Sequence, residues 1–129
     1  MVLDTSAAIE LLLSLPKARQ VQGRIEQADW QIAAPELFWV EVLQVLRRRV
    51  ASGHTALQDA VEAQEILRDL NLHFFQHEIL SARIWQLRDN LTAYDASYVA
   101  LAELLDADLV TTDAKLAGAP GHSARVVVL

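Results

Sequence analysis

Four acidic side chains stand where they could act together on one ligand, namely Asp4, Glu41, Asp95 and Asp113. Asp4 and Asp113 directly follow short apolar runs, and the carboxyl ends of parallel strands meet at one rim of a sheet. Four carboxylates at that rim would repel each other and hold raised pKa values unless a cation neutralised them. Magnesium (Mg²⁺) suits such an all-oxygen site, and two ions would clamp the attacking and leaving oxygens of a phosphodiester. The pattern therefore predicts metal-dependent phosphodiester chemistry.

Helix capping is the simpler explanation for each aspartate taken alone. Asp4 and Asp113 each precede a helical segment, and Asp95 follows Thr92 by the three residues of a capping box. Glu41 has no such explanation, because it lies inside an apolar helical segment, where a carboxylate is rarely buried without a partner. The metal-site hypothesis therefore depends most on Glu41 and on the order of all four acids.

Apolar strands alternate with helical segments along the chain, which predicts an α/β fold with a parallel sheet covered on both faces. Thr5 and Ser6 offer N-cap oxygens to the first helix, Thr55 to the fourth and Thr92 to the sixth. At 129 residues, we expect one domain spanning residues 1–129. The expected strands are residues 1–3, 31–34, 72–76, 109–112 and 124–129, and the expected helices are residues 7–15, 16–29, 35–53, 55–70, 78–90, 92–106 and 114–116.

The composition, with 53% apolar and 22% charged residues, is that of a compact globular protein. A net charge of -6 is unlike that of a general nucleic-acid binder, so any such surface must be local. The absence of cysteine excludes disulfides and fits a reducing compartment, by default the cytoplasm. We expect no signal peptide or membrane span, because Glu10 and Ser14 interrupt the apolar stretch 9–15 and Asp4 lies too near Met1 for a leader.

Four segments that contain the acids resemble the PIN-domain ribonucleases, and most closely the VapC toxins of bacterial and archaeal toxin-antitoxin pairs. The resemblance covers nearly the whole chain, and its specificity lies in having all four segments in order. It implies a three-layer α/β/α sandwich, a magnesium-dependent endoribonuclease, a homodimer, and a cognate VapB-like antitoxin that covers the acidic pocket. The segments are Val2-Leu3-Asp4-Thr5-Ser6, residues 35–48 with Glu41, Thr92-Ala93-Tyr94-Asp95-Ala96 and Leu109-Val110-Thr111-Thr112-Asp113.

The metal ligands that the resemblance implies are all present. We expect Asp4, Asp95 and Asp113 to bind Mg²⁺, with Mn²⁺ as an alternative ion, directly or through water, and Glu41 to orient or help to activate a water molecule. One position departs from the family pattern: Gln44 stands where the family often has Asn, three residues after the second acid. A supporting hydrogen bond is therefore in doubt at that position.

Two hydroxyl groups next to the acids, those of Ser6 and Thr112, are candidates for holding a phosphate oxygen or a water on the metal, although a local turn or cap explains each as well. The RNA-binding candidates are Arg47, Arg48 and Arg49, the densest positive cluster, although a solvated helix end explains at least part of that run. By resemblance, the substrate is a structured RNA such as a transfer RNA loop, where unstacked bases are accessible.

The other aromatic and imidazole side chains receive no place in the site. We expect the aromatic residues to lie in the core or at a dimer interface, because no loop clusters them with basic residues. The histidines have no ligand-like spacing, so we assign them no metal. The aromatic residues are Trp30, Phe38, Trp39 and Trp85, and the histidines are His54, His73, His77 and His122.

Two other function classes remain as alternatives. A phosphoryl-transfer enzyme of the haloacid-dehalogenase or receiver type also places aspartates at strand ends beside magnesium. The first requires a second Asp two residues after the first, where this chain has Ser6, and the second requires paired acids near the first strand, where Thr5 follows Asp4. A non-catalytic α/β interaction module would use the acids only as caps and as sockets for arginines of a partner.

Overall fold

A five-stranded, all-parallel sheet forms the centre of the computed structural model, which describes residues 1–129. The strands are only two or three residues long and lie in the order β3-β2-β1-β4-β5. Strand β1 is central, so the chain first extends the sheet on one side and then crosses to the other. The bounds are β1 Val2–Leu3, β2 Ala33–Pro35, β3 His73–Phe75, β4 Leu109–Thr111 and β5 Val126–Val128.

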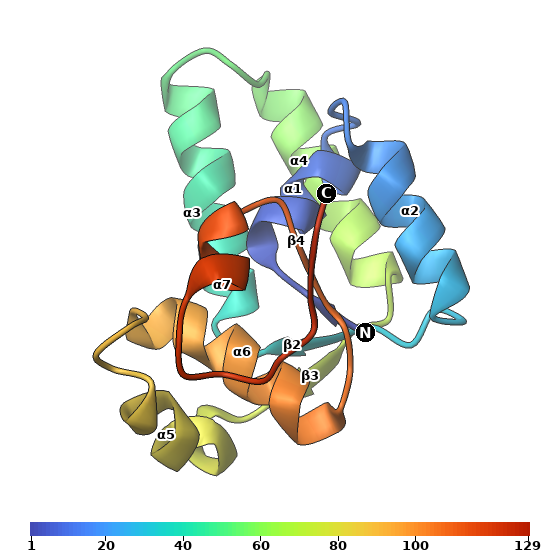
Figure 1. The fold of residues 1–129 in the computed structure, drawn as a ribbon. Coiled ribbons are helices and arrows are strands. Elements are labelled where there is room, and N and C mark those ends of the chain that lie inside the picture. Colours follow the sequence, from blue (N-terminus) through green and yellow to red (C-terminus); the bar gives the residue numbers. More distant parts are fainter.

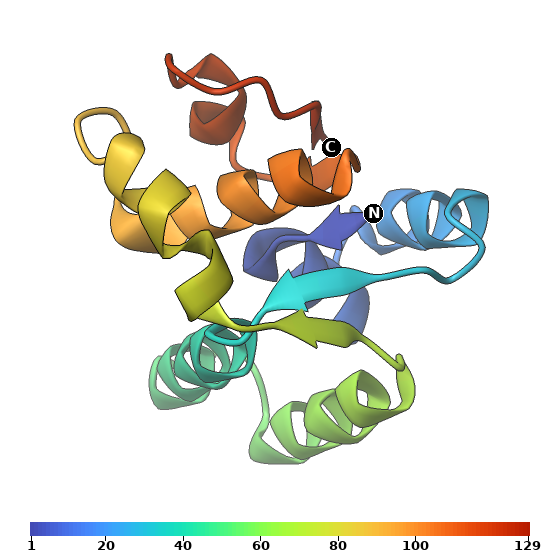
Figure 2. The same ribbon diagram turned by 90° about the horizontal axis from the view of Figure 1, so that it is seen from below.

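Helices cover both faces of this sheet, as the two ribbon views show (Figures 1 and 2). Helix α6 packs across β1, β2 and β4 on one face, and α5 packs against α6; α1 covers the other face beside α2, α3 and α4. The predicted three-layer α/β/α sandwich is confirmed. The helices are α1 Thr5–Leu12, α2 Ala18–Gln27, α3 Phe38–Ala51, α4 Leu57–Asp69, α5 His77–Gln86, α6 Ala93–Leu105 and α7 Ala114–Gly118.

The central strands and helix α6 carry the core. Val2, Leu3 and Leu109 are fully buried, as expected for a parallel sheet that is covered on both faces. Every residue of α6 from 96 to 102 is buried, because this helix is enclosed between the sheet and α5. The core therefore fixes α6, whose first turn carries Asp95, relative to the strand ends.

An ion pair joins α5 to α6 at the other end of the latter helix. Arg83 donates two hydrogen bonds to Glu103, from Nε to Oε2 at 2.7 Å and from Nη2 to Oε1 at 2.9 Å. The Arg83 guanidinium holds the pKa of Glu103 down to about 2, although partial burial acts in the opposite direction. Helix α6 is therefore held by a bidentate ion pair as well as by core packing.

All twelve expected elements are present, with bounds that differ by a few residues, but two caps were predicted wrongly. Asp4, not Thr5 or Ser6, is the N-cap of α1. Ala56, not Thr55, is the N-cap of α4, and the Thr55 hydroxyl instead accepts a hydrogen bond from Arg49 Nε at 3.0 Å. A single domain over residues 1–129 stays a prediction, and strands from both ends of the chain pair in the same sheet.

Of the four aromatic residues expected in the core or at a dimer interface, two contact the core, and a dimer-interface position for the other two stays a prediction. Phe38 is fully buried and Trp39 packs partly against the core. Trp30 and Trp85 are 53% and 69% exposed, so neither belongs to the core. The Arg88 guanidinium lies 5.1 Å from the centre of the Trp85 ring, a cation–π contact at the surface. None of the helices combines the length and apolar character needed to cross a membrane.

Candidate active site at the carboxyl edge of the sheet

The structure brings all four predicted acids to one cleft of about 500 Å³. Asp4 follows β1 and Asp113 follows the neighbouring strand β4 by two residues, while Glu41 lies on α3 and Asp95 on α6. Strand order reverses between β1 and β4, and open parallel sheets place ligands in the crevice beyond such a point. The cleft therefore lies where the topology of the sheet favours a binding site.

Each acid stands at the N-terminal end of a different helix. Asp4 is the N-cap of α1 and Asp113 the N-cap of α7; Glu41 lies in the first turn of α3 and Asp95 in the first turn of α6. Thr92 caps α6 by accepting a hydrogen bond from the Asp95 backbone N–H at 3.1 Å. Helix N-termini carry partial positive charge, which stabilises nearby carboxylates and offsets part of their repulsion.

Capping and participation in the cleft are not alternatives for these aspartates. Asp4 accepts a hydrogen bond from the Ser6 backbone N–H at 3.4 Å, and Asp113 Oδ1 accepts one from the Lys115 backbone N–H at 2.9 Å. In each case one carboxylate oxygen does the capping, and the other oxygen accepts no hydrogen bond from the protein. The capping explanation is correct for both residues and leaves an oxygen of each available.

Asp4 is 9% exposed, and its Oδ2 oxygen is held by two hydroxyl groups. Ser6 Oγ donates to it at 2.5 Å and Thr111 Oγ1 at 2.7 Å, and Thr111 also accepts from the Asp113 backbone N–H at 2.9 Å. Thr112 contributes its backbone N–H to Ser6 Oγ at 2.9 Å, and its side chain does not line the cleft. The predicted Ser6 hydroxyl thus contacts Asp4, and the second hydroxyl on this acid is that of Thr111, not Thr112, which the sequence reasoning missed.

Glu41 is held by one side chain from α1 and one from α6. Its Oε2 oxygen accepts hydrogen bonds from Tyr98 at 2.5 Å and from Thr5 Oγ1 at 2.9 Å, while Oε1 accepts none. The expectation of an apolar environment was wrong, because the neighbouring Val40 and Leu43 are 69% and 42% exposed. Tyr98 was also missed, although it lies three residues after Asp95 and so on the same side of α6.

Burial and, after it, neighbouring negative charge raise the pKa values of two of the acids. Burial raises the pKa of Glu41, and the charges of Asp4 and Asp95 raise it further, against the lowering by its two hydroxyl donors. Burial likewise raises the pKa of Asp95, with further contributions from Asp4 and Asp113. In each case the raised pKa means that the folded protein disfavours the ionised carboxylate, mainly because the group is partly buried and in addition because negative charges lie nearby.

The donor set fits a hard divalent cation. Asp4 Oδ1, Glu41 Oε1, Asp113 Oδ2 and at least one oxygen of Asp95 accept no hydrogen bond from the protein, and oxygen ligands are those that Mg²⁺ prefers. In the arrangement described, no three His, Asp or Glu side chains lie close enough together to hold one ion. Because magnesium keeps several waters, ligation through water needs less convergence than direct ligation by all four acids.

Positive charge borders the acids on the α3 side. Arg48 and Arg49 line the cleft, whereas Arg47 lies outside it and donates from Nε to Gln44 Oε1 at 3.0 Å. Gln44 also lines the cleft. Its amide oxygen accepts the hydrogen bond from Arg47, and Gln44 makes no hydrogen bond to any of the four acids. Of the three candidate arginines, the structure therefore places two beside the acids.

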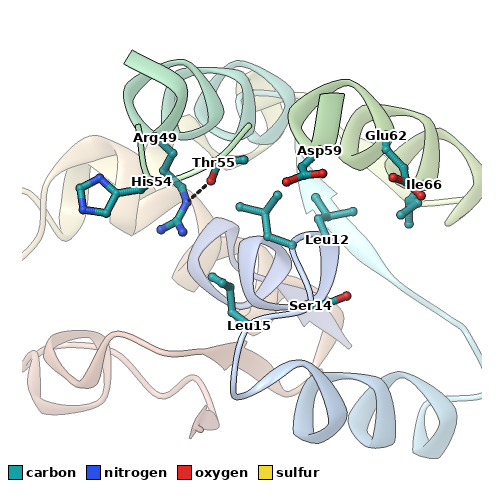
Figure 3. Close-up of a pocket in the computed structure, with 10 residues that line it drawn as sticks. Leu12, Ser14, Leu15, Arg49, His54, Thr55, Asp59, Glu62 and Ile66 are labelled. Atoms are coloured by element: carbon teal, nitrogen blue, oxygen red, sulfur yellow. Dashed lines mark hydrogen bonds between the residues drawn. The ribbon is translucent and has the colours of Figure 1, made fainter. Parts of the chain in front are cut away.

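A second cleft, of about 310 Å³, adjoins the acidic one and shares Leu15 and Arg49 with it (Figure 3). It lies between the end of α1 and the α3–α4 pair, and its polar side chains include His54 and Asp59. Arg49 donates to Thr55 at this border, which fixes the guanidinium between the two clefts.

Comparison with known proteins assigns the chain to a family. Residues 1–121 match the PIN domain. Ribonuclease VapC1 of Mycobacterium tuberculosis is 45% identical over 122 residues, covering 93% of this chain and 90% of that protein. A toxin-antitoxin complex from Klebsiella pneumoniae superposes with a TM-score of 0.68 at 24% identity, covering 98% of this chain and 95% of that one. VapBC2 from Rickettsia felis, bound to a promoter DNA fragment, superposes with a TM-score of 0.72 at 13% identity, covering 99% of this chain and 97% of that one.

The chain therefore belongs to the PIN domain family. The resemblance to VapC-type PIN proteins is confirmed, and membership decides against the haloacid-dehalogenase and receiver families. VapC ribonucleases with this domain generally depend on a divalent metal, in agreement with the donor set of the cleft.

Replacing Asp95 with Asn removes one of the mutually repelling charges, so we expect the metal-free protein to become more stable at pH 7. A carboxyl whose pKa is raised on folding destabilises the fold only when ionised, so its effect is absent below its ordinary pKa of 3.8 and complete above the raised value. The stability gain from Asp95→Asn should therefore shrink as the pH falls towards 3.8. Urea unfolding in the presence of a chelator measures it, with the exposed Asp89→Asn as control; a loss of stability at pH 7 would contradict the explanation.

Proposed function

We propose that the acidic cleft is the active centre of a divalent-metal-dependent endoribonuclease, the toxin of a VapBC-type toxin-antitoxin pair. The observation that carries the proposal is the convergence of Asp4, Glu41, Asp95 and Asp113 on one cleft, each with at least one oxygen free of protein hydrogen bonds. The relatives support it, since those that cover most of this chain are named VapC ribonucleases.

The resident ion in this proposal is Mg²⁺, with Mn²⁺ as the alternative. Asp4, Asp95 and Asp113 would hold it, because they come from the two central strand ends and from the buried helix between them. When bound, the ion supplies Lewis-acid polarisation of the phosphodiester and neutralises the developing negative charge. A two-ion arrangement uses the same residues, because four acids can hold one ion firmly or two in turn.

Glu41 has a different role from the three aspartates. Hydrogen bonds from Thr5 and Tyr98 fix Oε2, so Oε1 is the oxygen presented to the cleft. There it can orient the attacking water and accept its proton, and a carboxylate with a raised pKa is a better base for that step than an ordinary one. The three aspartates would hold the ion that neutralises the phosphodiester charge, while Glu41 directs the water.

RNA would approach this negative protein along the arginine side of the cleft. Arg48 and Arg49 line it, and both could pair with phosphates next to the scissile bond. Arg47, outside the cleft, would contact phosphates further along the strand. Ser6 remains a candidate for phosphate contact because it lines the cleft, whereas the Thr112 side chain does not line it and Thr112 only donates its backbone N–H to Ser6 Oγ. The substrate in this proposal is a single-stranded segment, such as a transfer RNA loop, whose unstacked bases are accessible to a protein.

The partners and location follow the same proposal. A VapB-like antitoxin would inhibit the enzyme by covering the acidic cleft, and structural neighbours include toxin-antitoxin complexes. A homodimer would cover apolar surface that the single chain leaves exposed, including Val40 and Leu43 on α3 and Ile79 and Trp85 on α5. Both the dimer and a cytoplasmic location stay predictions.

Replacing Asp4 with Asn should abolish magnesium-dependent RNA cleavage while the fold stays intact, and Asp95→Asn should do the same. Loss of outer-shell partners typically costs roughly 10- to 100-fold in metal affinity or activity, so loss of a direct ligand should cost more than about 100-fold. The measurement is cleavage of structured RNA by purified protein as magnesium is titrated, with circular dichroism to verify folding.

The matched control is Asp69→Asn, since Asp69 is exposed at the end of α4, outside the cleft. Retained cleavage in the Asp4 and Asp95 variants would contradict the assignment of these residues as metal ligands. A folded wild-type protein that neither binds magnesium nor cleaves RNA would favour the non-catalytic module instead.

Charge reversal of Arg48 and Arg49 should weaken RNA binding and flatten its dependence on salt, because RNA that makes fewer phosphate contacts releases fewer counterions on binding. Arg47→Glu should have a smaller effect, since Arg47 lies outside the cleft. Binding of a non-cleaved RNA is measured at several salt concentrations, and the exposed Arg68→Glu on α4 controls for net charge. An unchanged salt slope in the Arg48/Arg49 variant would remove these residues from the RNA path.

A further inference from the structure

Tyr98 is the largest fully buried side chain of the protein, and its hydroxyl contacts two residues that line the acidic cleft, Thr5 and Glu41. It is 1% exposed, yet its hydroxyl lies 2.5 Å from Glu41 Oε2 and 2.8 Å from Thr5 Oγ1. A buried phenol needs a hydrogen-bond partner, but a core position could have been filled by Phe without that need. The hydroxyl therefore calls for an explanation beyond packing.

The side-chain oxygens of Thr5, Glu41 and Tyr98 all contact one another and so join three helices. Thr5 opens α1, Glu41 lies in the first turn of α3, and Tyr98 lies in the middle of α6. The hydroxyl groups of Thr5 and Tyr98 both donate to the same oxygen, Glu41 Oε2. No other side chain donates to Glu41, so these two bonds alone select its orientation.

Orientation matters for this acid more than for the aspartates. Asp4 and Asp113 sit on backbone segments fixed by the sheet and by their capping bonds. Glu41 is one methylene longer and is only half buried, so without its two donors the carboxylate would sample several rotamers. A hydrogen bond to a charged group is strong enough to select one of them.

We infer that Tyr98 is a positioning residue whose hydroxyl, together with that of Thr5, turns the Glu41 carboxylate so that Oε1 faces the metal and water side of the cleft. The inference rests on the proposed function, since it assigns Glu41 a task in the same site. Tyr98 touches neither the substrate nor the ion and acts only through Glu41.

The test compares Tyr98→Phe with Tyr94→Phe, a matched loss of one phenolic hydroxyl on the same helix, since Tyr94 is 66% exposed and makes no side-chain hydrogen bond. Two quantities are measured: kcat and KM for RNA cleavage in magnesium, and binding of Mn²⁺ to the RNA-free protein by electron paramagnetic resonance. We expect Tyr98→Phe to lower kcat roughly 10- to 100-fold with little change in KM, and to weaken Mn²⁺ binding, because outer-shell partners have effects of this size. Tyr94→Phe should leave both unchanged.

A double-mutant cycle with Glu41→Gln separates positioning from a general structural role. If Tyr98 acts through Glu41, the Tyr98→Phe/Glu41→Gln double variant should be no worse than Glu41→Gln alone. A purely structural role would instead lower kcat or Mn²⁺ binding equally in both backgrounds, which would overturn the inference. Wild-type kcat and Mn²⁺ binding in Tyr98→Phe would overturn it as well.

Thr5 supplies a second series in case Tyr98→Phe does not fold. Thr5→Ser keeps a hydroxyl and should retain kcat, whereas Thr5→Val removes it at similar volume and should lower kcat. Equal kcat values for these two variants would contradict the positioning role. Full activity of Glu41→Gln would instead defeat the proposed function itself, so the two failures are distinguishable.

Discussion

Mutual repulsion among four carboxylates is the constraint that the rest of the structure accommodates. Asp4, Glu41, Asp95 and Asp113 line one cleft, and their charges raise the pKa of Glu41 and Asp95 beyond the effect of burial alone. The fold offsets part of this repulsion because each acid lies at the N-terminal end of a helix, which carries partial positive charge. The remaining negative charge is what a divalent cation would neutralise.

The protein holds most of these acids by one oxygen and leaves the other free. Hydroxyl and backbone donors fix Asp4 Oδ2, Glu41 Oε2 and Asp113 Oδ1. This division explains why residues that look like ordinary helix caps can also form a reactive site. It also places the site on helices and strand ends anchored by the core, which suits a constellation that must keep its geometry.

Much of the fold was predictable because each element carries its own local signal. Apolar runs such as Val2-Leu3 and Leu109-Val110 indicate strands buried on both faces, and periodic stretches between them indicate helices. The order of the four acids predicted the cleft because parallel strands direct their carboxyl ends to one edge. The cap at Thr5 was wrong because the preceding Asp4 carboxylate accepts from the first turn instead. The cap at Thr55 was wrong because its hydroxyl accepts from Arg49, which is close only in the folded protein, and no side chain caps α4.

The supporting contacts were not predictable, because they join residues far apart in the sequence. Thr111 reaches Asp4 and Tyr98 reaches Glu41 only after the sheet and helices have packed. The burial of Glu41 likewise comes from α1 and α6 and not from its own helix, where Val40 and Leu43 are exposed. The exposure of Trp85 could not be predicted, because the local sequence does not distinguish a buried indole from an exposed one that contacts a neighbouring arginine, here Arg88.

The most direct test of the account is a crystal structure of the protein soaked in Mn²⁺, with anomalous scattering used to locate the ion. The account predicts a manganese peak in the acidic cleft, with oxygens of at least two of Asp4, Glu41, Asp95 and Asp113 at about 2.0–2.2 Å or joined to it through water, a spacing typical of octahedral oxygen sites. A cleft that stays empty at saturating Mn²⁺, or an ion bound only elsewhere on the protein, would contradict it.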